Sequence, residues 1–296
     1  MSDATGFRQY RGDGTTRDGQ PAPARGEAGR YLASPELAAA VNTMLAVEQP
    51  LLVTGEAGTG KTVLADSIAA ELELGEVLVF TVRSDDQGRD LLYEFDNLQR
   101  FYDAQVQDPR ARDRANYLRL GALGQALRSE TRRLVLIDEI DKAPRDFPND
   151  LLDVLDRMEL RIPEIGLEVR ARHRPVVVIT SNRESQLPDP FLRRCVFHHI
   201  EFPDDALLRR ILDERLGPLH LAAELRDRVV RKFTELRQVQ GLQKRPATSE
   251  MLTWARVLER AGVTPPELEV EPGNLPHLGA LLKTREDLER VRRRAS

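Results

Sequence analysis

Five apolar runs, rich in Val, Ile and Leu, recur along the first two thirds of the chain, with helical patterns between them. Runs that are apolar at nearly every position are typical of parallel strands buried on both faces, because connecting helices cover the sheet. The sequence therefore predicts an α/β fold with a parallel five-stranded sheet, whose active groups line the carboxyl ends of the strands. The expected strands cover residues 51–53, 77–82, 134–137, 176–180 and, more briefly, 199–202.

After Pro203 the pattern changes to helices alone. Amphipathic stretches at 204–216, 220–238 and 247–262 are joined by Gly-Pro and Gln-Gly turns, which predicts a small helical domain appended to the sheet. A last helical pattern ends in a run of arginines, and such a run is usually a solvated helix end. The expected divisions are an arm at 1–29, an α/β domain at 30–203, a helical domain at 204–270 and a helical tail at 271–296.

The first 29 residues are rich in Gly, Asp, Arg, Thr and Pro, and Phe7 and Tyr10 are almost their only large apolar groups. Such a segment buries too little surface to offset its ordering entropy, so we expect a flexible arm. Its Arg8 and Arg11 are candidates for docking on a neighbour. The globular pattern begins near residue 31, where Ser34-Pro35 predicts the capped start of a helix.

Composition narrows the class of protein. The 296 residues are enough for one large or two moderate domains, and the net charge of −4 gives no global reason to expect nucleic acid as a partner. No apolar run approaches the length of a membrane span, and the N-terminus lacks a signal-peptide layout, so we expect a cytoplasmic protein without a membrane partner. Cys195 is the single cysteine, which excludes an internal disulfide. We expect it to be buried and inert rather than catalytic.

The strongest chemical signal fits the phosphate-loop pattern G-x-x-x-x-G-K-[ST] at every fixed position, between an apolar strand and a helical pattern. Glycines let backbone N–H groups point into one concavity, and the helix N-terminus adds positive potential there. A glycine-rich turn with an incidental lysine would leave the full pattern unexplained. The residues expected to hold a nucleoside triphosphate are Gly55, Glu56, Ala57, Gly58, Thr59, Gly60, Lys61, Thr62 and Val63, with Lys61 reaching the β- and γ-phosphates and the Thr62 hydroxyl coordinating Mg²⁺.

Paired carboxylates follow the third expected strand. Asp138 is a candidate partner for Mg²⁺, and Glu139 is a candidate base that polarises the water attacking the γ-phosphate. The alternative is a pair of acids that simply face water at a strand end. That alternative is weak, because acids close to a buried sheet need a cationic partner.

Two further groups follow along the chain in the order that such a site needs. Asn182 follows the fourth expected strand and is a candidate for orienting the attacking water, although an ordinary turn asparagine explains it equally well. Arg193 and Arg194 lie on a helix just before the last strand. An arginine that reaches the γ-phosphate of a neighbouring subunit would neutralise transition-state charge. The alternative for this pair is a solvated basic helix end.

These motifs, in this order, resemble those of AAA+ ATPases, a class of P-loop NTPases, and within that class the MoxR branch and its CoxD-like relatives. The resemblance covers about residues 31–265. It implies that ATP and Mg²⁺ bind, that Lys61 and Thr62 act as Walker A and Asp138 and Glu139 as Walker B, and that Asn182 is sensor 1. It also implies that Arg194 is the arginine finger. Arg193 stays open as an alternative, because Cys195 replaces the Phe that usually follows the finger.

Two segments support the resemblance to the MoxR branch. Residues 83–93 resemble the helix-2 insertion, which in the family projects toward the ring pore or a partner; a polar loop is the alternative. Residues 160–169 alternate around Gly166, which predicts a β-hairpin like the one that precedes sensor 1 in the family.

The resemblance implies that the helical domain is a lid. This domain departs from the family in one respect. Ala247 stands where MoxR proteins often place the sensor 2 arginine. Lys244 or Arg245 is expected to take that place, and the residues do not decide between them.

The resemblance implies an ATPase that acts at subunit interfaces in a ring, expected to be a hexamer, and remodels a partner protein. A protein with a von Willebrand factor A domain, or a metalloenzyme that needs maturation, is the implied partner. The alternative is a nucleic-acid motor or loader on the same core. The negative net charge and the absence of a helix-turn-helix or a basic stretch interleaved with aromatics count against nucleic acid.

Overall fold

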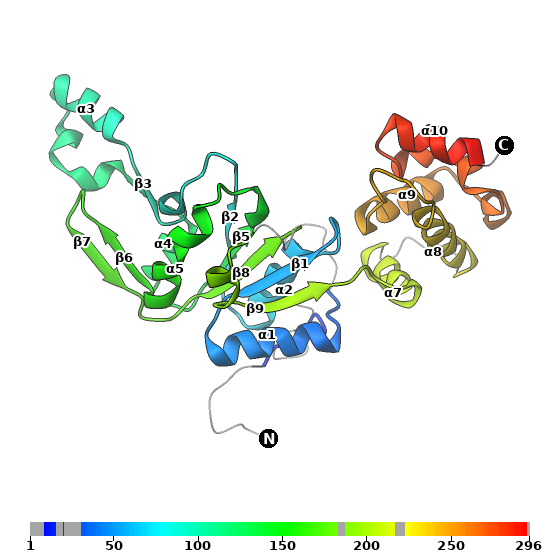
Figure 1. The fold of residues 1–296 in the computed structure, drawn as a ribbon, viewed down its shortest axis with the longest axis horizontal. Coiled ribbons are helices and arrows are strands. Elements are labelled where there is room, and N and C mark those ends of the chain that lie inside the picture. The colour runs from blue at the N-terminus through cyan, green and yellow to red at the C-terminus, as the bar shows by residue number, and fades with distance from the viewer. Residues whose placement is uncertain (1–8, 16–19, 21–30, 183–186, 217–222, 295–296) are drawn as a thin grey trace. The chain divides into compact units, whose positions relative to one another are not determined.

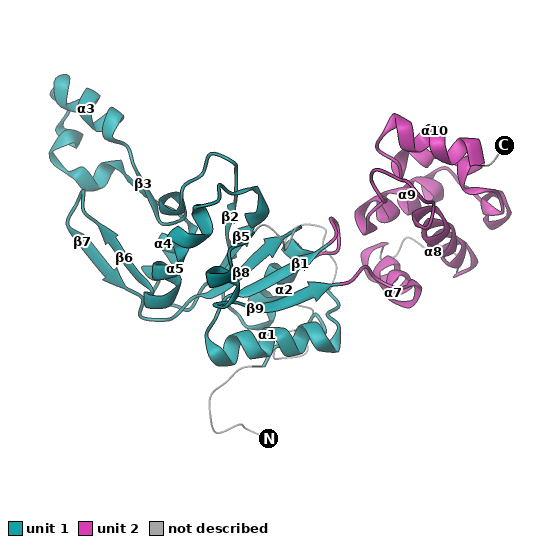
Figure 2. Ribbon diagram, in the orientation of Figure 1, with its two compact units in different colours: residues 1–25, 31–55, 61–200 teal, residues 26–30, 56–60, 201–296 magenta. Residues whose placement is uncertain are grey.

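The computed structural model describes residues 9–15, 20, 31–182, 187–216 and 223–294. The chain forms two compact units (Figure 2). The first unit comprises residues 1–25, 31–55 and 61–200, and the second comprises 26–30, 56–60 and 201–296. Within the described residues, no helix has both the length and the apolar character that crossing a bilayer requires.

A five-stranded sheet forms the centre of the first unit, in the order β2-β5-β8-β1-β9, and all its pairings are parallel (Figure 1). This confirms the predicted α/β fold. The last strand begins at Val196 rather than at residue 199, because it is an edge strand whose burial alternates, so its sequence lacks a continuous apolar run. The strands are β1 (Leu51–Gly55), β2 (Leu78–Thr81), β5 (Leu134–Asp138), β8 (Val176–Ser181) and β9 (Val196–Ile200).

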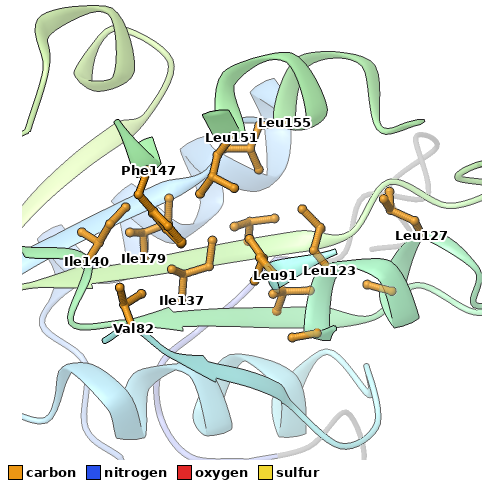
Figure 3. Packing of buried hydrophobic residues seen from close by; sticks show 14 of the residues in the cluster. Val82, Leu91, Leu123, Leu127, Ile137, Ile140, Phe147, Leu151, Leu155 and Ile179 are labelled. Carbon is orange, nitrogen blue, oxygen red and sulfur yellow. The ribbon is translucent and has the colours of Figure 1, made fainter. Parts of the chain in front are cut away.

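The sheet separates two hydrophobic cores, because alternate side chains of each strand point to opposite faces. On one face, Leu51 and Val53 pack with α1 (Pro35–Val47) and α2 (Lys61–Glu71). Helix α1 begins as predicted, with the Leu37 N–H donating to the Ser34 hydroxyl at 3.1 Å. On the other face lie α4 (Ala122–Leu127) and α5 (Phe147–Arg157). Figure 3 shows this second core, with Leu123, Leu127, Phe147, Leu151 and Leu155 beside Ile137 and Ile179.

The insertion between β2 and β5 is longer than the sequence suggests. It extends from η1 (Gly88–Leu91) to β4 (Leu118–Leu120), where we expected an insertion at 83–93. Strands β3 (Tyr93–Phe95) and β4 pair antiparallel, and α3 (Asn97–Gln105) with the turns η2 (Pro109–Arg112) and η3 (Arg114–Tyr117) lies beyond their end (Figure 1). The expected hairpin before sensor 1 is present as β6 (Glu159–Ile162) and β7 (Leu167–Arg170), and the turn uses Gly166 at φ 65°.

The described part of the N-terminal segment differs from a flexible arm. Tyr10 is 1% exposed, and its hydroxyl hydrogen-bonds to the Ser67 hydroxyl at 2.8 Å. The carboxylate of Glu71 accepts the backbone N–H groups of Arg11 and Gly12. These partners lie in α2, far along the chain, so composition alone gave no sign of them. Phe7 and Arg8 lie outside the described residues.

The second unit is built from α7 (Asp205–Leu216), α8 (Ala223–Arg237), α9 (Thr248–Arg260) and α10 (Arg285–Arg294), with short turns η6 (Pro265–Leu268), η7 (Pro272–Asn274) and η8 (Leu278–Ala280). Trp254 is fully buried at its centre, and its indole N–H donates to the Pro276 carbonyl at 2.8 Å. The segment expected as a separate tail at 271–296 contributes Leu282 and Val291 to the same core. It is therefore part of the helical unit.

Candidate nucleotide-binding and hydrolysis site

The phosphate loop connects β1 to α2. Its glycines Gly55, Gly58 and Gly60 have φ angles of 146°, 77° and 87°, which residues with side chains rarely adopt. The Thr59 hydroxyl donates to the Glu56 carbonyl at 2.9 Å and closes the loop. Lys61 is 8% exposed, and its ammonium donates to the Gly55 carbonyl at 2.8 Å. The lysine is thus held at the strand end, where the phosphates of a nucleotide would lie.

The Asp138 carboxylate meets Thr62 at the same edge of the sheet. The Thr62 hydroxyl lies 3.2 Å from both carboxylate oxygens, and the buried Thr180 hydroxyl donates to one of them at 2.6 Å. Hydroxyl and carboxylate oxygens are ligands that Mg²⁺ prefers. The described residues contain no group of three or more His, Cys, Asp or Glu placed to hold a metal ion. The donor set therefore fits an ion that takes its other ligands from phosphates and water.

Glu139 has a left-handed backbone, with φ 61° and ψ 47°, at the point where β5 gives way to η4 (Ile140–Lys142). Its N–H donates to the Thr180 hydroxyl at 2.9 Å, which fixes the turn against β8. Its carboxylate pairs with the ammonium of Lys142, and this hydrogen bond raises the pKa of Lys142. A side-chain-bearing residue in this conformation is strained by about 1 kcal/mol or more, and such strain is common at functional sites.

Asn182 follows β8 and is exposed. Its backbone N–H donates to Asp141 Oδ1 at 2.9 Å, so the turn after β8 is tied to η4. Strands β5 and β8 are parallel neighbours, with Ile137 opposite Ile179. Their carboxyl ends therefore bring Asp138, Glu139 and Asn182 to one edge, which is the arrangement expected from the order of the motifs.

The two candidate finger residues differ in their surroundings. Arg194 follows α6 (Asp189–Leu192), and its Nε donates to Asp156 Oδ2 at 2.8 Å. Its Nη1 also donates to the Pro190 carbonyl at 3.1 Å. Arg193 is exposed, and within the described residues its side chain has no hydrogen bond or ion pair; only its backbone N–H is engaged, with the Asp189 carbonyl at 3.0 Å. Burial raises the pKa of the Cys195 thiol to about 12, which agrees with an inert cysteine.

In the second unit, Lys244 and Arg245 lie between α8 and α9. The backbone N–H groups of Gln243 and Lys244 donate to the buried Asp287 carboxylate at 2.8 and 3.1 Å. Arg245 is 3.8 Å from Glu56, which belongs to the same unit.

A further arginine of this unit, Arg237, is closer to Glu56 and donates to its carboxylate at 2.6 Å. The guanidinium of Arg237 lies over the Phe202 ring, 3.3 Å from its centroid, and only 10% of the side chain is exposed. Sequence reasoning missed Arg237, because an arginine in the last turn of an amphipathic helix looks like an ordinary solvated cation.

Comparison with known proteins identifies the segment that carries these motifs. Residues 50–195 match the family model of the AAA domain, dynein-related subfamily. This segment is an AAA domain. It contains the candidate site residues from Gly55 to Arg194, whereas Lys244 and Arg245 lie outside the matched range.

One similar solved structure is that of NtrX from Brucella abortus in complex with ATP. The TM-score is 0.51 at 15% sequence identity, so the likeness concerns the fold alone. It covers 85% of this chain and 56% of NtrX, so the chain spans little more than half of that protein's length. No curated protein matches the chain.

Two other residues of the AAA domain were missed by the sequence analysis. The Thr180 hydroxyl hydrogen-bonds to both Asp138 and Glu139. In the sequence, the one sign of this role is a hydroxyl residue at the end of an aliphatic run. Asp156 holds Arg194. It gave no signal, because it is one of several acids on the amphipathic helix α5.

Proposed function

We propose that this chain is an ATP-hydrolysing AAA+ ATPase of the MoxR branch, working as a ring that remodels or matures a partner protein in the cytoplasm. The observation that carries the proposal is the Asp138–Glu139 pair, held by Thr180 beside the Thr62 hydroxyl. A protein that only binds nucleotide has no need of a second carboxylate at this point, whereas hydrolysis needs a base.

Each residue of the site has a role in this proposal. The Lys61 ammonium neutralises charge on the β- and γ-phosphates of ATP, and the backbone N–H groups of the loop bind the same oxygens. Thr62 and Asp138 would hold Mg²⁺, which would neutralise phosphate charge when bound. The Glu139 carboxylate takes a proton from the attacking water, and the Asn182 amide orients that water.

The site is completed by a second copy of the chain. Arg194 pairs with Asp156 and with the Pro190 carbonyl, not with any of the nucleotide-site residues of its own subunit. We assign it to the γ-phosphate of a neighbouring subunit, where an arginine accelerates hydrolysis by about 10³-fold or more. Repetition of this contact would build a closed ring, for which six subunits remain the expected number.

The insertion supports a protein partner. Helix α3 and the turn after it carry an exposed apolar stripe of Leu98, Phe101, Tyr102 and Val106, with exposures of 57–80%. The opposite face of the helix is polar: Asp103 is buried and accepts from the Tyr117 hydroxyl at 2.7 Å. An apolar stripe of this kind on the outside of a helix is typical of a protein-interaction surface. A partner with a von Willebrand factor A domain is our first candidate.

The alternative function is a nucleic-acid motor or loader. The net charge of −4 and the apolar rather than basic character of the α3 stripe disfavour it. Turnover that rises severalfold on adding DNA or RNA, and not on adding a protein partner, would favour this alternative.

The test of the hydrolytic role is Glu139→Gln. The substitution keeps the size of the side chain and removes the base, so ATP affinity is expected to change by less than about threefold while turnover falls by about 10²-fold or more. Nucleotide binding is measured by equilibrium dialysis and turnover by phosphate release. The control is Glu130→Gln, which changes an exposed acid. Glu130 precedes β5 in the sequence, whereas Glu139 follows it. Near-normal turnover of the Glu139 variant would remove that residue from the role of base.

A further inference from the structure

The guanidinium of Arg194 is anchored through two of its three nitrogens. Its Nε–H donates to Asp156 Oδ2 at 2.8 Å, and its Nη1 donates to the Pro190 carbonyl at 3.1 Å. A guanidinium has five N–H donors, so these two contacts leave three for another acceptor. Arg194 is thus held in place through Nε and Nη1, while both donors of Nη2 and one of Nη1 stay available.

The groups that hold Arg194 lie next to residues of the hydrophobic core of the AAA domain. Asp156 follows Leu155 on α5, and Leu155 is 2% exposed. Pro190 precedes Phe191 on α6, and Phe191 is fully buried in the same hydrophobic cluster. The backbone positions that carry both acceptors are therefore fixed by packing, independently of Arg194 itself.

The ion pair between Arg194 and Asp156 contributes little to the stability of the fold. The side chains of Arg194 and Asp156 are 41% and 48% exposed, and exposed ion pairs contribute little to the free energy of unfolding. Its main effect is on the conformation of Arg194, because a free arginine samples many rotamers and a reaction needs one of them. The neighbouring Arg193, which has no such contact, is not held in this way.

We propose that Asp156 is a positioning residue that presents Arg194 to the nucleotide site of the neighbouring subunit. The inference rests on the proposed function, since it takes the shared site as given. It also decides between the two candidate arginines, because only Arg194 is held in advance of assembly. Loss of Asp156 is expected to lower kcat about tenfold at unchanged KM, which is less than the loss caused by removing Arg194.

The experiment mixes two kinds of inactive subunit. Subunits with Glu139→Gln keep Arg194 and serve as finger donors, and subunits with Arg194→Ala keep Glu139 and serve as acceptors. Mixed in equal amounts, they are expected to recover turnover at those interfaces where a donor's Arg194 meets an acceptor's intact site. Adding Asp156→Ala to the donor is expected to reduce the recovered kcat about tenfold, and Asp156→Asn, which keeps one acceptor oxygen, is expected to reduce it less.

The control is Asp153→Ala in the donor. Asp153 lies on the same helix and forms an exposed pair of the same kind with Arg157 at 2.8 Å, so its loss is expected to leave recovery unchanged. Thermal unfolding and particle mass of each donor establish that it folds and assembles.

Three results are distinguishable. A tenfold deficit for the Asp156 donor alone supports the inference. Equal recovery with the Asp156→Ala and unmodified donors overturns the positioning role while leaving the shared site intact. No recovery with the unmodified donor overturns the shared site itself, and the inference falls with it.

Discussion

At the scale of single residues, the site depends on hydroxyl groups as much as on its charged groups. Thr62 and Thr180 both contact Asp138, and Thr180 also accepts the N–H of Glu139. Thr180 is 1% exposed, so its hydroxyl works in surroundings where an unmade hydrogen bond is costly. Glu139 keeps its left-handed backbone because Thr180 and the end of β5 hold it there.

Thr180→Val tests this arrangement, because valine has nearly the same shape and no hydroxyl. The substitution leaves the Glu139 N–H without its acceptor and removes a donor from the Asp138 carboxylate, so we expect the free energy of unfolding to fall by about 2 kcal/mol. Turnover is expected to fall about tenfold as the Glu139 turn loosens. Urea denaturation and phosphate release measure the two effects.

The control for this prediction is Thr43→Val on α1. The Thr43 hydroxyl is exposed and donates only to the Ala39 carbonyl, so little change is expected in stability or turnover. Equal behaviour of the two variants would contradict the role of Thr180.

At the scale of elements, the strands and motifs were predictable because each is signalled by neighbouring residues. The run Leu134–Ile137 predicts a buried strand and the next two residues are the carboxylates, so sequence order alone places Asp138 and Glu139. The features that were not predicted depend on contacts between distant residues. Tyr10 is buried by α1 and α2, β9 is partly exposed as an edge strand, and Asp156 meets Arg194 only after α5 and α6 have packed together.

The last element, α10, is a second case of a distant contact. Asp287 at its start is 0% exposed and accepts the N–H groups of Gln243 and Lys244. Burial alone would raise the pKa of Asp287, but these hydrogen bonds, a hydrogen bond with Thr284 and the positive charge of Arg290 outweigh it, and the pKa lies below its usual value. The helix thereby fixes the loop that carries Lys244, one of the two candidates for sensor 2.

Asp287→Asn is expected to lower the free energy of unfolding of the helical unit by about 2 kcal/mol at neutral pH. Because the folded-state pKa is lowered, the stabilisation by Asp287 is fully present above the unfolded-state value of about 3.9 and is lost as pH falls through the folded-state value. Urea denaturation between about pH 7 and pH 3 should therefore show the gap between wild type and variant constant at first and closing below about pH 4.

The matched change Glu286→Gln removes an exposed carboxylate from the same helix and should have little effect at any pH. A gap for Asp287→Asn that widens as the pH falls would contradict the account of its hydrogen bonds.

At the scale of the whole molecule, the proposed shared site requires more than one copy of the chain. The AAA domain supplies the loop, the carboxylates and Asn182 from one edge of its own sheet, while Arg194 is paired with Asp156. A site that draws its last cation from a neighbour makes hydrolysis depend on assembly, so that the state of the nucleotide and the geometry of the interface are coupled.

The dependence of hydrolysis on assembly is tested most directly by measuring turnover per subunit as a function of protein concentration, with particle mass measured on the same samples. Monomers at high dilution are expected to be nearly inactive, and turnover per subunit is expected to rise together with the mass of the assembled ring to a plateau. Turnover per subunit that stays constant from monomer to assembly would contradict this dependence.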